Sequence, residues 1–127
     1  MKPLPLLTAL PLLATPSVLA HIDTTHFLGF GYHASEVAAT VSGDGFWRPT
    51  TRGANAALFP AKTPLTLSGW FWPENTEALL GGTVLAVDEP IGQGHAIVFT
   101  QNPIPRPFWQ GLNRMLLAAM LFGPGGE

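Results

Sequence analysis

The densest hydrophobic pattern lies in the last third of the chain. Residues 83–87 and 96–100 are two apolar runs rich in β-forming residues, and residues 90–94 between them are rich in turn residues. Two such runs around a short turn are typical of a β-hairpin. Residues 107–122 then carry apolar side chains at helical i, i+3 and i+4 spacing, which predicts a helix that packs on the sheet through one stripe. This stripe consists of Phe108, Leu112, Met115, Leu116 and Ala119.

Shorter patterns upstream predict the remaining elements. Residues 36–41 and 55–59 are strand candidates, and Pro60 ends the second because proline has no N–H to donate to a ladder. Residues 73–80 predict a short helix, since proline stands at its start, acidic residues lie near its first turn and two glycines follow it. Residues 23–32 read as a structured loop in which Asp23 accepts backbone N–H bonds.

Taken together, these elements predict an α/β fold. We expect a small mixed sheet, closed by the C-terminal hairpin and covered by the C-terminal helix. Arg114 lies off the apolar stripe of that helix, so it is expected to be solvated.

The first twenty residues allow two interpretations. Lys2, the apolar run after it and the small residues at 17–20 are typical of a signal peptide, which favours a secreted or periplasmic protein. No permanent membrane anchor is expected, because three prolines interrupt a run that is shorter than the ~20 residues a spanning helix needs. Alternatively, residues 17–22 form the first strand, and cleavage after Ala20 would divide it. Residues 21–127 are expected to form a single domain.

The amino-acid composition of the chain excludes some classes of function. With 127 residues the chain suits one domain. Hydrophobic residues make up 46% and charged residues only 11%, against a usual charged share of about 25%. This shortage of solvated surface suggests that part of the surface contacts a partner. The net charge of −2 and the lack of a basic run argue against nucleic acid as that partner. The chain has no cysteine, which excludes disulfides and thiolate chemistry.

One histidine pattern raises the question of a zinc site. His33 and Glu36 have the His-x-x-Glu spacing that supplies two ligands in carboxypeptidase-type zinc sites, and His95 is the only histidine downstream that could be the third. A pattern with two fixed positions arises often by chance, and no general base can be placed beside it. We therefore assign no metal ligands, and a surface loop is the favoured interpretation.

Other candidate chemistry has simpler interpretations. No serine lies in a Gly-x-Ser-x-Gly elbow. Asp88 and Glu89 are adjacent, so in a strand they point to opposite faces, and we interpret them as solvated residues of the hairpin loop. The segment from Gly92 to Gly94 lacks the third glycine and the following helix of a phosphate-binding loop, and reads as a turn. No catalytic residue and no cofactor is assigned.

Three consecutive aromatic residues form the most unusual cluster. An extended segment can bury at most one face of Trp70, Phe71 and Trp72, so part of their area must face a loop, a partner or a ligand. We interpret the cluster first as cover for the edge of the core and second as a partner surface.

Several segments together resemble a known family. They are Asp23-Thr-Thr-His26, residues 28–32, Leu67-Ser-Gly-Trp70, residues 92–99 and residues 106–117. In this order they resemble the C-terminal accessory domain of bacterial secreted proteins of the zinc carboxypeptidase A-like metallopeptidase family. Phe27 departs from the family pattern, which usually has proline at that position.

The resemblance implies a fold similar to class I glutamine amidotransferases, or a flavodoxin-like fragment of it, without the catalytic cysteine. It also implies a non-catalytic accessory or docking domain, as a fragment or a stand-alone copy, whose partner is a carboxypeptidase-like catalytic domain. The zinc ligands of the family belong to that upstream domain, so none is carried over to this chain. Two alternatives stay open: a minimal zinc-dependent carboxypeptidase using His33, Glu36 and His95, and a secreted module that binds peptide or glycan at Trp70 to Trp72.

Overall fold

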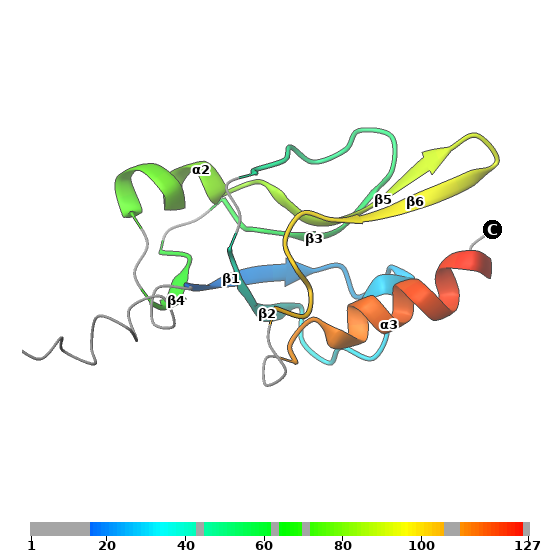
Figure 1. Ribbon diagram of the computed structural model, residues 1–127, viewed down its shortest axis with the longest axis horizontal. Coiled ribbons are helices and arrows are strands. Elements are labelled where there is room, and N and C mark those ends of the chain that lie inside the picture. The colour runs from blue at the N-terminus through cyan, green and yellow to red at the C-terminus, as the bar shows by residue number, and fades with distance from the viewer. Residues whose placement is uncertain (1–15, 43–44, 62–63, 70–71, 106–109, 126–127) are drawn as a thin grey trace, which may run out of the picture.

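The computed structural model describes residues 16–42, 45–61, 64–69, 72–105 and 110–125. Along the chain these form β1 (Ser17–Ile22), the 3-10 turn η1 (Phe27–Gly29), β2 (Glu36–Thr40), β3 (Ala54–Leu58), β4 (Thr66–Ser68), the π-helical turn η2 (Pro73–Glu77), α2 (Ala78–Leu80), β5 (Val84–Ile91), β6 (Gly94–Phe99), α3 (Asn113–Phe122) and the 3-10 turn η3 (Gly123–Gly125). Figure 1 shows their arrangement. The fold is therefore a mixed α/β fold.

Strand β1 lies inside the sheet and organises it. The strand order is β2-β1-β3-β5-β6, and the short β4 pairs with β1 on the same edge as β3. Along β1, Val18, Ala20 and Ile22 are buried while His21 between them is exposed, as the two-residue period of a strand requires. The second interpretation of residues 17–22, as a strand, is thus confirmed, and its buried face contributes to the core. Residues 1–15 lie outside the described residues.

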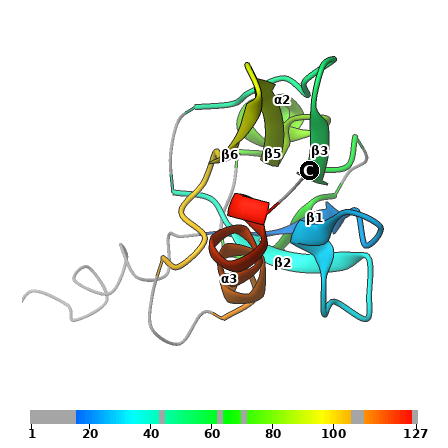
Figure 2. The ribbon, with the colours of Figure 1, turned by 90° about the vertical axis from the view of Figure 1, so that its right-hand side faces the viewer.

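The sheet curves around α3. Figure 2 looks along α3 and shows β2, β1, β3, β5 and β6 following one another around the helix. Met115 and Leu112 reach the core from α3 and its N-cap, and both are fully buried. They join buried side chains from the strands and from η1, of which the largest are Phe59, Ile22, Leu28, Leu65, Leu80 and Leu85. Among the described residues, no helix has the length and apolar content to cross a membrane.

Two predictions about the architecture are corrected. The sheet was expected to be mixed, but every pairing among the described strands is antiparallel. The connections are short hairpins and loops, and a parallel pair needs a crossover of a dozen or more residues. The tail helix was expected to begin at residue 107 but begins at Asn113, because Leu112 has φ −105° and ψ 0° and therefore acts as the N-cap. Phe108 lies outside the described residues.

The predicted hairpin is confirmed, with longer strands. β5 continues to Ile91 and β6 begins at Gly94, so only Gly92 and Gln93 form the turn. Gly92 has φ of 61°, a value that favours glycine as the first central residue of a two-residue hairpin turn. Asp23 also behaves as predicted, since its Oδ1 accepts the Thr25 N–H at 2.9 Å and the Thr25 hydroxyl at 2.6 Å. These bonds hold the pKa of the Asp23 carboxyl below its ordinary value.

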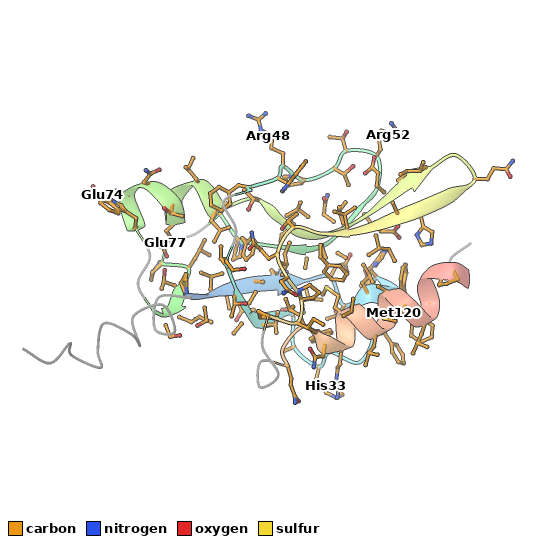
Figure 3. All side chains as sticks on the ribbon, viewed as in Figure 1. His33, Arg48, Arg52, Glu74, Glu77 and Met120 are labelled. Atoms are coloured by element: carbon orange, nitrogen blue, oxygen red, sulfur yellow. The ribbon has the colours of Figure 1, made fainter. Side chains whose placement is uncertain are left out.

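The predicted short helix over residues 73–80 is present as η2 followed by α2. Its last π-helical residue, Glu77, is buried, and its Oε1 accepts the backbone N–H of Leu65, the N–H of Thr66 at 2.9 Å and the Thr66 hydroxyl at 3.2 Å. Figure 3 shows Glu77 directed toward the segment that enters β4. The N–H bond from Thr66 is the main cause that lowers the pKa of Glu77, so the carboxylate ties η2 to the edge of the sheet.

We expect Glu77→Ala to lower the free energy of unfolding by about 1–3 kcal/mol, because the buried Leu65 N–H loses its acceptor. Urea denaturation of both proteins measures the difference. Glu74→Ala is the matched control, since Glu74 is exposed on the same turn. In the wild type this contribution is present above the ordinary glutamate pKa of 4.5 and is lost as the pH falls through the lower folded pKa. Equal losses in the two variants would contradict this role.

Candidate docking surface

Helix α3 is apolar on two opposite faces. Its inner face buries Met115 and Ala118, whereas Leu117, Met120 and Leu121 are 55%, 66% and 72% exposed. These three positions have i, i+3 and i+4 spacing, so they form one continuous outer stripe. A helix at the surface of a globular protein normally carries polar residues there, and a helix that is apolar all round is normally covered. The outer stripe of α3 is therefore a candidate binding surface.

The loop after η1 extends this stripe. Phe30 is 68% exposed, and its ring meets the ring of Phe122 edge to face, with centroids 5.6 Å apart and an interplanar angle of 77°. We call Phe30, Leu117, Met120, Leu121 and Phe122 together the α3 face. A shallow hollow of about 270 Å³ lies within this face, between the loop and the helix. Its walls are apolar except for Arg114, so the surface offers one guanidinium beside a hydrophobic patch.

Two hydrogen bonds fix the loop to the beginning of α3. The Tyr32 hydroxyl donates to the carbonyl oxygen of Gly111 at 2.7 Å, and Nη1 of Arg114 donates to the carbonyl oxygen of Gly31. Burial raises the pKa of the Tyr32 phenol, in keeping with a hydroxyl that keeps its proton. Gly31 has φ of 85°, and a Cβ at this position would lie 3.0 Å from Nη1 of Arg114. Arg114 is exposed to solvent, as predicted. Its hydrogen bond to Gly31 was not predicted.

A polar cluster lies at the other end of α3. Asp88 on β5 accepts from two histidines: its Oδ2 lies 3.2 Å from Nε2 of His26, and its Oδ1 lies 2.6 Å from Nδ1 of His95. Nε2 of His95 lies 2.5 Å from the carbonyl oxygen of Gly123, directly after α3. The cluster therefore joins the loop before η1, both strands of the hairpin and the end of the helix.

The interpretation of Asp88 and Glu89 as solvated loop residues is wrong. Both lie within β5, and the side chain of Asp88 is only 14% exposed. Their opposite orientation was predicted correctly, since Glu89 is bonded on the other side to the Thr50 hydroxyl and lies 3.9 Å from Nε of Arg52. The two carboxylates thus hold separate parts of the chain to β5.

The residues of the zinc hypothesis are not brought together. His33 is exposed in the loop before β2, Glu36 is on β2 opposite His21 of β1, and His95 is on β6. Figure 3 places His33 at the edge of the molecule away from the β5–β6 hairpin. Within the described ranges, no group of three or more histidine, aspartate or glutamate side chains could hold a metal ion.

The aromatic cluster is described only in part. Trp70 and Phe71 lie outside the described residues, and Trp72 is 55% exposed at the N-cap of η2. Its role as a partner surface stays a prediction. The α3 face was missed from the sequence because only the inward stripe was counted. The signal was present in the same segment, as the spacing of Leu117, Met120 and Leu121.

Comparisons with known proteins add no family: no protein-family model, curated protein or solved structure matches the chain.

Two methionines of α3 test the assignment of its faces. We expect Met115→Ala to lower the free energy of unfolding by about 2–5 kcal/mol, because it leaves a cavity in the core. Met120→Ala should change it by less than about 0.5 kcal/mol, since that side chain is 66% exposed. Urea denaturation measures the free energy of unfolding of both variants, which carry the same Met→Ala substitution on the same helix. A large loss from Met120→Ala would mean that the outer face is already covered by the chain itself.

Proposed function

We propose that this chain is a non-catalytic docking domain, and that the α3 face is the surface by which it docks. The observation that carries the proposal is the exposed apolar face of a helix whose opposite face is already buried. At the usual size of large apolar side chains, its five residues expose on the order of 500 Å². A standard interface covers about 800 Å² on each partner, so the α3 face would supply most of the apolar centre of one.

The chemical character of the α3 face indicates what kind of partner surface would be complementary to it. An apolar patch bordered by Arg114 fits a hydrophobic patch with a carboxylate at its border. The low charged share of the whole chain, 11%, supports a surface that is covered in use. Metal-dependent catalysis by this chain has less support, because His33, Glu36 and His95 lie apart.

We further propose that the partner is a catalytic domain of the zinc carboxypeptidase A-like type, in a secreted or periplasmic protein. The motif resemblance supports this. Tyr32 and Arg114, which lie in two of the resembling segments, hold the loop with Phe30 to the beginning of α3. An amidotransferase-like fold for the complete accessory domain is part of the same proposal.

Binding to a separately expressed catalytic domain of a secreted zinc carboxypeptidase A-like protein tests the proposal. Isothermal titration calorimetry should detect a complex with the wild-type chain. The double variant Met120→Gln/Leu121→Gln should bind at least about tenfold more weakly, because two apolar side chains leave the interface.

Leu79→Gln is the matched control, since Leu79 is a 58% exposed leucine on α2 and does not belong to the α3 face. It should bind like the wild type. Equal weakening by the control, or a chain that takes up stoichiometric zinc and releases C-terminal residues from peptides by itself, would overturn the proposal.

A further inference from the structure

In the polar cluster around Asp88, the His95 ring has an unusual hydrogen-bonding arrangement. Both ring nitrogens of His95 face oxygen acceptors, Oδ1 of Asp88 at 2.6 Å and the carbonyl oxygen of Gly123 at 2.5 Å. A carboxylate and a carbonyl oxygen cannot donate, so both nitrogens must carry a proton for both bonds to form. The arrangement therefore requires the imidazolium form of His95.

His26 takes a different protonation pattern in the same cluster. Its Nδ1 accepts the N–H of Leu28 at 3.3 Å, which leaves a proton on Nε2 to donate to Asp88. The Asp88 carboxylate thus receives one donor from each histidine. The ring of Phe27 lies edge-on to His95, with centroids 6.1 Å apart, and covers one side of this arrangement.

The bond to Gly123 holds the end of α3 on β6. Gly123 is buried, and a Cβ on it would lie 3.1 Å from Cδ1 of Ile97, so the helix end fits tightly against the strand. When His95 loses one proton, the remaining one stays on Nδ1, because the Asp88 carboxylate is a stronger acceptor than a neutral carbonyl. The lone pair of Nε2 then faces the Gly123 oxygen, and an attractive contact becomes repulsive.

We propose that His95 is a pH-dependent clasp, which holds the C-terminal end of α3 on the β5–β6 hairpin while its ring is doubly protonated and releases it on deprotonation. The clasp lies beside Phe122, so it also controls the position of one end of the α3 face. It concerns the isolated chain, and it stands or fails independently of any docking partner.

The surroundings of His95 determine the direction of the response. The bonds to Gly123 and Asp88 raise the pKa of His95 above its ordinary value of 6.5. Asp88 bonds to the ring from β5, and His26 bonds to the same carboxylate from the loop before η1. Arg52 lines a hollow together with Asp88 and His95. On α3, among its described residues, the only titratable side chain is Arg114 at the opposite end. Because the folded pKa is raised, the clasp is fully closed below about pH 6.5 and opens as the pH rises through the folded pKa.

Nuclear magnetic resonance on the full chain tests the clasp. Nitrogen-15 shifts of the His95 ring should show protons on both nitrogens at pH 6 and a pKa above 6.5. Hydrogen-exchange protection factors of the last turn of α3, residues 119–122, should fall about tenfold between pH 6 and pH 9 as one charged hydrogen bond is lost.

In His95→Gln the protection of these amides should not depend on pH, because glutamine does not titrate. His33→Gln is the matched control, since His33 is exposed in a loop, and it should respond like the wild type. If His95→Gln does not fold, the wild-type ring titration still decides. A single proton on His95 at pH 6, or protection of the last turn that is constant between pH 6 and pH 9, would overturn the proposal.

Discussion

The rest of this structure depends on how α3 packs against the sheet, because the helix is apolar on two faces and the sheet covers only one of them. Met115 and Ala118 fill the space inside the curved sheet, which forces Leu117, Met120 and Leu121 to face outward. Helical geometry makes this unavoidable, since side chains three and four positions apart share a face. Exposure of these apolar side chains to water is unfavourable, and contact with the surface of a partner would remove that unfavourable exposure.

Hydrogen bonds at both ends of α3 determine which of its two apolar faces points toward the core. Near the beginning, the Tyr32 hydroxyl and the Arg114 guanidinium bond to backbone carbonyl groups of Gly111 and Gly31. At the end, His95 bonds to the carbonyl oxygen of Gly123. Hydrophobic burial alone is not directional, and either face of this helix could satisfy it. Directional bonds at fixed positions remove that ambiguity, so the outward orientation of the α3 face is set by bonds of Tyr32, Arg114 and His95, none of which is among its five residues.

The sequence predicted the elements whose signals are local. The hairpin and the short helix at residues 73–80 carry their own turn residues, and both are present. The strand at residues 17–22, which was one of two interpretations of that segment, is present as well. The start of α3 was placed six residues too early, because the apolar periodicity of the sequence continues upstream of Asn113, whereas the backbone of Leu112 is not helical. The antiparallel sheet was also missed, since the pairing of β1 with β3 and β4 depends on contacts far apart in the chain.

The polar cluster could not be predicted for the same reason. His26 and Asp88 are 62 residues apart, and no spacing rule connects them. The α3 face was predictable in principle, because Leu117, Met120 and Leu121 lie within one turn and a half of helix. Trp70, Phe71 and Trp72 were predicted as a possible partner surface because three aromatic residues are consecutive, whereas the α3 face combines side chains of a helix with Phe30 from a separate loop.

The most direct test of the central claim is a hydrogen-exchange footprint of the chain with and without a carboxypeptidase-like catalytic domain. If α3 presents the docking surface, the complex should slow exchange in residues 27–32 and 113–122 and leave residues 72–80 unchanged. Slower exchange at residues 72–80 alone would place the interface at the aromatic cluster and contradict the account.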